Sequence, residues 1–297
     1  MKKSLKYRFI QALFSWFGRI STPKRLRIGA YLAAIMPYVA LRRTHIVRTN
    51  LKLCFPDADA ATLRRWEKEH LRFFTQSMID RGLLWYGDPE RIKQEVSISG
   101  FEHIDDLVQA KHPLLMLAPH FIGLDAAATR ISMGLREACT MYKPQRDTDF
   151  DEMIRLGRGR FNEIHLLSRK DGIRGIIRYM RRGVPVYYLP DMDFGRDESI
   201  FVPFFSIPSA TLPSTAQIAK SFNAKVVPIV TQLDIKTGHY HVEVLPALEN
   251  FPGEQSIEEA TARINQELEQ WILRDVPQYY WVHRRFKTRP EGEAEVY

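Results

Sequence analysis

The chain has 297 residues, with 43 Lys and Arg against 35 Asp and Glu, which gives a formal net charge of +8. Its hydrophobic content of 45% is ample for a packed core and excludes a disordered chain. Two cysteines exclude a disulfide scaffold and indicate a reducing compartment, the cytoplasm. Residues 1–50 hold eleven basic residues and no acidic one, which leaves +8 − 11, or −3, for the rest. The basicity therefore belongs to the N-terminal end of one α/β-sized domain.

Residues 5–19 have the periodicity of an amphipathic helix. Its apolar face comprises Leu5, Phe9, Leu13, Trp16 and Phe17, and its polar face comprises Arg8, Gln11, Ser15 and Arg19. A basic helix with aromatic residues on its apolar face is typical of segments that lie in an anionic membrane interface. The same face could instead pack on the protein's own core. Residues 28–41 are uncharged, but they are too few for a membrane-spanning helix and Pro37 interrupts them.

Further along, a helical stretch at residues 59–85 precedes alternating strands and helices. Short apolar runs predict buried strands at residues 114–118, 184–189 and 226–230, and alternation predicts a more exposed strand at 240–245. Helices are expected at 121–131, at 171–182 with Asp171 as its cap, and after Ser256, which has capping-box spacing to Glu259. This order predicts an α/β fold with a mostly parallel sheet flanked by helices.

The end of the first predicted strand carries the clearest candidate for chemistry. Pro119 and His120 follow residues 114–118 directly, and Asp125 comes five residues after His120. If a helix begins near His120, Asp125 lies about one turn further along the same face, within reach of the imidazole. A carboxylate on one ring nitrogen leaves the other nitrogen to accept a proton. Since no Ser or Cys adjoins the pair, we expect it to activate a substrate hydroxyl.

Other interpretations of these residues stay open at this point. A His and an Asp at this spacing also occur as a hydrogen-bonded histidine in a core. Asp191 and Asp193, after the strand at 184–189, resemble the metal-nucleotide motif of many glycosyltransferases. No nucleotide-binding pattern accompanies them, so we expect no metal site. The basic run at 283–289 is compatible with nucleic-acid binding, but no nucleic-acid-binding pattern accompanies it, and we expect no such partner.

Position and accompanying motifs strengthen the first interpretation. His120-x4-Asp125 directly after an apolar strand resembles the catalytic motif of the glycerolipid and lysophospholipid acyltransferase superfamily. Further segments narrow the resemblance to its bacterial lipid A branch, the late lauroyl and myristoyl acyltransferases. In that family's order, they are residues 50–56 (NLKLCFP), 142–144 (YKP), 157–160 (GRGR), 169–171 (RKD), 190–195 (PDMDFG), 201–205 (FVPFF) and 281–290 (WVHRRFKTRP).

The resemblance implies a glycerol-3-phosphate acyltransferase-like fold and a reaction at the cytoplasmic face of the cell inner membrane. A fatty acyl group would pass from acyl carrier protein to a hydroxyl of a Kdo-bearing lipid A precursor, with anionic inner-membrane lipids as a further partner. It further implies that His120 is the general base and Asp125 its orienting acid. Substrate-binding residues implied by the family motifs are Tyr142, Lys143, Arg158, Arg169 and Asp191. A thioester already has a good leaving group, so we expect no cofactor.

Two departures from the family pattern concern the acceptor. Several lipid A enzymes have Glu where this chain has Asp125, and Lys143 replaces the more familiar Arg of its motif. Both changes keep the charge of the side chain, so we expect the same reaction. They leave the identity of the acceptor lipid less closely defined by the resemblance. We therefore expect a membrane anchor at residues 1–45 and an acyltransferase domain at residues 46–297. The alternatives are acylation of another lysolipid, such as a lysophospholipid or an ornithine lipid, and a non-catalytic module that binds anionic membranes.

Overall fold

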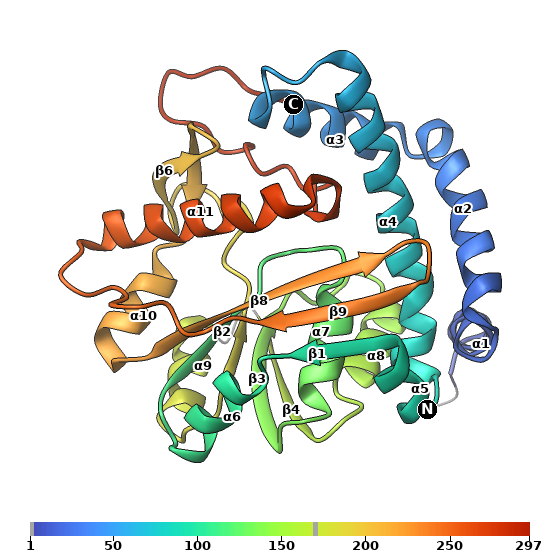
Figure 1. Cartoon of the computed structure of the whole chain (residues 1–297), viewed down its shortest axis with the longest axis horizontal. Helices are drawn as coiled ribbons and strands as arrows, with labels where there is room; N and C mark the ends of the chain where they lie inside the picture. Colours follow the sequence, from blue (N-terminus) through green and yellow to red (C-terminus); the bar gives the residue numbers. More distant parts are fainter. Residues whose placement is uncertain (1–2, 169–171) are drawn as a thin grey trace.

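The computed structural model describes residues 3–168 and 172–297 and shows a seven-stranded sheet flanked by helices (Figure 1). The strand order is β1-β9-β8-β2-β5-β3-β4, and every neighbouring pair is parallel except β8 with β9. The strands are β1 (Val96–Ser99), β2 (Leu114–Leu117), β3 (Glu137–Tyr142), β4 (Glu163–Ser168), β5 (Val186–Tyr188), β8 (Lys225–Asp234) and β9 (His239–Val244). A separate antiparallel hairpin consists of β6 (Ile200–Phe204) and β7 (Ile207–Thr211). The predicted α/β class and mostly parallel sheet are confirmed.

The helices lie around this sheet in two groups. The N-terminal group comprises α1 (Leu5–Arg19), α2 (Thr22–Val39), α3 (Leu41–Cys54) and α4 (Ala60–Tyr86). The others are α5 (Pro89–Glu95), α6 (Glu102–Gln109), α7 (Leu124–Ser132), α8 (Thr148–Arg158), α9 (Gly172–Met180), α10 (Ser214–Phe222) and α11 (Ile257–Arg274), with a short 3-10 turn at Val276–Gln278. Asp59 caps α4, and both hydrogen bonds of the predicted capping box at Ser256 and Glu259 are present.

The four apolar residues of β2 are completely buried, because helices cover this central part of the sheet on each side of the strand's pleat. The predicted strand at 114–118 is therefore confirmed, as are those at 184–189, 226–230 and 240–245, with boundaries shifted by one to four residues. Asp171, the predicted cap of α9, lies outside the described residues. The carboxyl ends of β2 and β5 meet at one edge of the sheet, where sites of this fold class gather.

Helices α1 and α2 both pack on α4 on the outside of the body, where α2 runs beside α4 and α1 crosses it (Figure 1). Tyr7 and Phe17 of α1 are buried, and a Cβ on Gly18 would lie 2.6 Å from the carbonyl oxygen of Gly82, so only glycine permits this crossing. Leu5, Phe9, Leu13 and Trp16 face outward. The helix at residues 5–19 is thus observed, whereas its binding to a membrane stays a prediction.

Arg25 fixes α2 to the rest of the fold. Its guanidinium is fully buried and forms ion pairs with Asp80 of α4 and Glu95 of α5. Pro37, which we expected to interrupt this segment, lies inside α2 close to its C-terminal end. Proline has no N–H to donate to the carbonyl four residues before it, so α2 lacks one hydrogen bond in its last turn but continues to Val39. None of the described helices combines the length and the apolar character that crossing a bilayer would require.

Candidate active site

His120 and Asp191 meet at the edge formed by the carboxyl ends of β2 and β5. Leu117, the last residue of β2, pairs in register with Tyr188, the last residue of β5. His120 and Asp191 each follow three residues later in the chain. Because the two strands are parallel neighbours, the loops that follow them emerge side by side. Sequence motifs marked both residues, but the pairing depends on β5 lying beside β2.

The contact between them has the geometry of a catalytic dyad. Nδ1 of His120 lies 2.7 Å from Oδ1 of Asp191, and the His120 backbone N–H donates to Oδ2 over 2.8 Å. Burial would raise the pKa of the Asp191 carboxyl, but the neighbouring His120 and its hydrogen bonds hold that pKa below its ordinary value. An ionised carboxylate at Nδ1 keeps the imidazole proton there, which leaves Nε2 to accept a proton.

Asp125 does not occupy the position that the sequence predicted for it. Helix α7 begins at Leu124, so His120 lies in the preceding loop and the two side chains do not share a helical face. Oδ2 of Asp125 accepts a hydrogen bond from Nε of Arg81 over 3.0 Å, and Oδ1 accepts one from Nε of Arg158 over 2.9 Å. In the described structure, Asp191 and not Asp125 orients His120.

The Asp125 carboxylate instead holds two arginines. It is buried, which alone would raise its pKa, but Arg158 and then Arg81 outweigh burial and lower the pKa to about 2. Its place in the first turn of α7 adds the favourable field of the helix N-terminus. Arg81 comes from the C-terminal part of α4, 44 residues before Asp125, and no motif in the sequence marked it. Asp125 is therefore a buried anion between two partly buried arginines.

Close packing of α8 on α4 places Arg158. Arg158 is the last residue of α8, and a Cβ on the preceding Gly157 would lie 2.3 Å from the Trp85 ring of α4. Tyr187 of β5 links the arginine cluster to the dyad, because its hydroxyl contacts Leu124, the residue before Asp125, and its own strand leads to Asp191. Burial first, then the charges of Asp125 and Asp191, raise the pKa of the Tyr187 hydroxyl, which donates to the Leu124 carbonyl. The site thus combines a proton acceptor with nearby fixed positive charge.

The remaining predicted substrate contacts lie at the end of β3 or outside the described residues. Tyr142 ends β3, and its hydroxyl donates to Asp151 of α8 over 3.3 Å. Lys143 follows it with an exposed side chain. Arg169 lies outside the described residues. Whether Tyr142, Lys143, Arg158 or Arg169 binds substrate stays a prediction.

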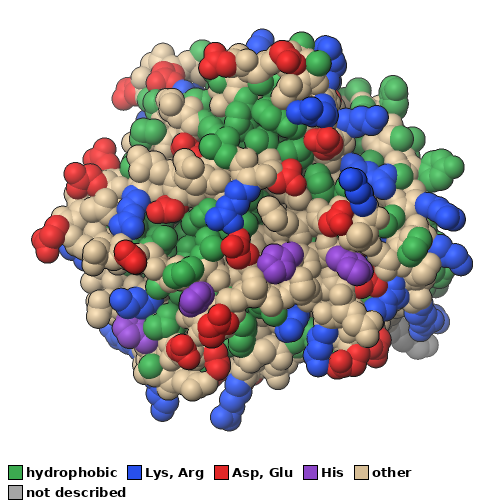
Figure 2. All heavy atoms as spheres, in the orientation of Figure 1, with side chains coloured by type: hydrophobic (Ala, Val, Ile, Leu, Met, Phe, Trp, Pro, Cys, Tyr) green, Lys and Arg blue, Asp and Glu red, His purple; other side chains and the backbone are tan. Residues whose placement is uncertain are grey.

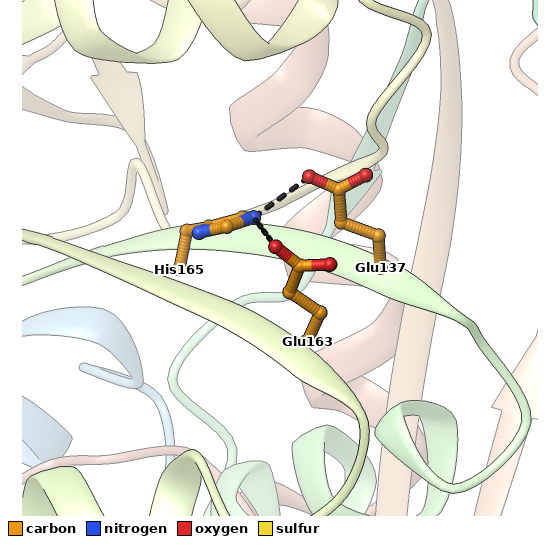
Figure 3. Close-up of side chains that lie close together, drawn as sticks. All are labelled: Glu137, Glu163 and His165. Atoms are coloured by element: carbon orange, nitrogen blue, oxygen red, sulfur yellow. Dashed lines mark hydrogen bonds and ion pairs between the residues drawn. The ribbon is translucent and has the colours of Figure 1, made fainter.

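Glu137, Glu163 and His165 form a separate charged cluster at the amino ends of β3 and β4 (Figure 3). Nε2 of His165 lies 2.7 Å from a Glu137 oxygen and 3.5 Å from a Glu163 oxygen, a spacing that could hold a divalent cation. Arg182 also contacts Glu137 over 3.2 Å and already supplies positive charge. Since β3 is parallel to β5 and β2, this cluster lies at the edge of the sheet opposite His120 and is no part of the dyad.

The dyad can remove a proton from a substrate hydroxyl and stabilise the imidazolium that results. Positive charge beside it can attract an anionic substrate or a developing oxyanion. An α/β fold with such a pair at the carboxyl ends of its central strands is compatible with an enzyme that transfers a group to a hydroxyl.

Comparison with known proteins identifies the class of transfer. The protein-family model described as bacterial lipid A biosynthesis acyltransferase matches residues 5–288, and the chain belongs to this family. It is 32% identical to a lipid A biosynthesis lauroyltransferase of Escherichia coli over 93% of this chain and 89% of the relative. It is 33% identical to a lipid A biosynthesis acyltransferase of Haemophilus influenzae, over 86% of this chain and 81% of the relative. A lipid A biosynthesis myristoyltransferase of E. coli is 32% identical over 84% of this chain and 76% of the relative. The protein is therefore an acyltransferase, as the sequence motifs predicted.

Proposed function

We propose that the protein transfers a fatty acyl chain from acyl carrier protein to a hydroxyl of a Kdo-bearing lipid A precursor at the cytoplasmic face of the inner membrane. The observation that carries the proposal is the contact between His120 and Asp191 at the adjacent carboxyl ends of β2 and β5. Family membership and the relatives' printed activities support the lipid A acceptor.

The proposed step needs one base and no covalent enzyme intermediate. Nε2 of His120 takes the proton of the acceptor hydroxyl as its oxygen attacks the thioester carbonyl. Asp191 stabilises the imidazolium, and collapse of the tetrahedral intermediate forms the ester and expels the thiolate, which takes the proton from His120. Asp125 has a supporting part, because it holds Arg81 and Arg158 where their charge acts on the anionic acceptor or the developing oxyanion.

The N-terminal helices support the proposed membrane location. Among the described residues, the exposed large apolar side chains are concentrated on α1 and on α2 with its C-terminal junction: Leu5, Phe9, Leu13, Trp16, Tyr31, Leu32, Ile35, Tyr38, Val39 and Leu41. Basic residues accompany them, and the edge of the molecule where α1 and α2 lie carries both kinds of side chain (Figure 2). An apolar surface with a basic surround is suited to an anionic bilayer.

Acceptor mass tests the reaction. Purified full-length protein is incubated with acyl carrier protein thioesters and either a Kdo-bearing lipid A precursor or a lysophospholipid. We expect the lipid A precursor to gain the mass of one acyl chain. A gain on the lysophospholipid alone would contradict the proposed acceptor. If neither acceptor gained mass while the protein bound vesicles, a non-catalytic membrane module would be favoured instead.

Vesicle sedimentation tests the membrane surface separately. The double substitution Phe9→Ser with Trp16→Ser removes two exposed apolar side chains, each worth roughly 1.5–3 kcal/mol when fully buried in an apolar phase. We expect it to reduce the fraction bound to anionic vesicles at least tenfold. The matched control is Leu273→Ser, which removes a comparably exposed side chain from α11. Equal binding by the double variant and the control would contradict the assignment.

A further inference from the structure

The C-terminal segment Tyr279–Thr288 contacts the loop that carries His120. The backbone N–H of Tyr280 donates to the carbonyl oxygen of His120 over 2.9 Å, and Phe121 forms an isolated β-bridge with Tyr279. The Tyr280 ring also lies 6.1 Å from the His120 ring, measured between centroids. The general base therefore has its backbone fixed by residues that are about 160 positions away in the chain.

The same segment holds the loop that carries Asp191. The backbone N–H of Asp193 donates to Nε2 of His283 over 2.9 Å. Thr288 donates to the Asp193 carboxylate twice, from its backbone N–H over 2.7 Å and from its hydroxyl over 2.8 Å. The Asp193 side chain is fully shielded from solvent. One short segment thus joins the loops of both members of the dyad.

His283 can make its contact only as a neutral imidazole. Nε2 accepts the hydrogen bond from Asp193, so the ring proton resides on Nδ1. Burial, followed by the neighbouring positive charge of His120, lowers the pKa of His283 to about 4, against the opposing effect of Asp191 and Asp193. A neutral acceptor also spares the dyad a second positive charge when His120 becomes protonated.

We propose that His283 is a positioning residue for the acyl transfer: by accepting from the Asp193 amide it fixes the loop that holds Asp191 on Nδ1 of His120. The proposal rests on the proposed role of the His120–Asp191 dyad. Asp191 and Asp193 are two residues apart, so a shift of the Asp193 amide is transmitted directly to the Asp191 carboxylate. Hydrogen bonds of a dyad must be held within a fraction of an ångström to remain effective.

Two amide substitutions at residue 283 distinguish the hydrogen bond to the Asp193 amide from the space that the side chain fills. In His283→Gln, the side-chain Oε1 stands the same number of bonds from Cβ as Nε2 and can accept from the Asp193 amide. In His283→Asn, the amide is one bond shorter and reaches only the place of Nδ1. We expect His283→Gln to keep kcat within about threefold of the parent. We expect His283→Asn to lose at least tenfold in kcat, with KM for the acyl thioester within about twofold. His239→Asn on the exposed end of β9 is the control and should match the parent.

A spectroscopic readout tests the same idea without substrate. In protein with ¹⁵N-labelled histidine, the His120 Nδ1–H shared with Asp191 should give a downfield proton resonance, absent from His120→Ala. We expect this resonance in His283→Gln and its loss or broadening in His283→Asn, with thermal unfolding confirming that each variant is folded. Equal kcat in the two amide variants, or loss of the resonance in folded His283→Gln, would overturn the proposal. Because this resonance is recorded without any substrate, it tests the role of His283 even if the acylated substrate is not a lipid A precursor.

Discussion

Substitution Asp125→Asn distinguishes the role that the structure gives Asp125 from the one that its sequence motif suggested. The structure places this carboxylate between Arg81 and Arg158, and its pKa falls from an ordinary 3.8 to about 2. At about 1.36 kcal/mol per pKa unit, this difference corresponds to about 2.5 kcal/mol of stability at neutral pH. Arg81 and Arg158, both partly buried, lose their shared anion as well, so we expect Asp125→Asn to lower the free energy of unfolding by roughly 2–4 kcal/mol.

Urea unfolding followed by circular dichroism measures this loss, with Asp106→Asn, on the exposed face of α6, as the matched control. The sign of the pH dependence follows from the lowered pKa. The carboxylate's stabilisation is complete above the unfolded-state pKa of about 3.8 and disappears as pH falls through about 2, so the difference between parent and variant should shrink in acid. If Asp125→Asn unfolded within 0.5 kcal/mol of the parent at pH 7, the arginine-holding role would be refuted.

Two further predictions concern stability. Arg25→Met leaves Asp80 and Glu95 buried without their cation, so it should lower the free energy of unfolding by about 3–5 kcal/mol. The control Arg27→Met, on the exposed side of the same helix, should lower it by less than about 0.5 kcal/mol. Similar losses in the two variants would contradict the structural role of Arg25. Burial lowers the pKa of His70 from 6.5 to about 4. Between pH 6.5 and pH 4 the His70 imidazole therefore binds a proton in the unfolded chain but not in the folded one. As a result, roughly 2 kcal/mol of the free energy of unfolding is lost between pH 6.5 and pH 5. His70→Asn can still donate to the Pro277 carbonyl and should show a shallower pH dependence in urea titrations; an unchanged slope would rule out this source.

The sequence predicted the elements whose pattern is locally strong. The apolar run of β2 and the capping box before α11 each depend on neighbouring residues. β3 and β4 were not predicted, because polar residues interrupt both strands and β4 lies at the half-exposed edge of the sheet. Local periodicity does not report which strands become neighbours.

The same limit applies to the site. His120 was placed correctly at the end of a buried strand, but its carboxylate partner was expected at Asp125, which is close in sequence. The actual contact with Asp191 requires that β5 insert beside β2, although β3 and β4 come between them in the chain. Arg81 and His283 reach the site from α4 and from the C-terminal segment, so their parts depend on tertiary packing. Resemblance of motifs identified the chemistry better than it identified the geometry.

The initial rate of acyl transfer by the parent and by His120→Ala tests the central claim most directly. Equal concentrations of each protein are given an acyl carrier protein thioester and the lipid A precursor, and ester formation is followed by mass. A positioned general base contributes about 10²–10⁴ to the rate, so we predict a fall of that size with an unchanged unfolding transition. Full activity in folded His120→Ala would contradict the account.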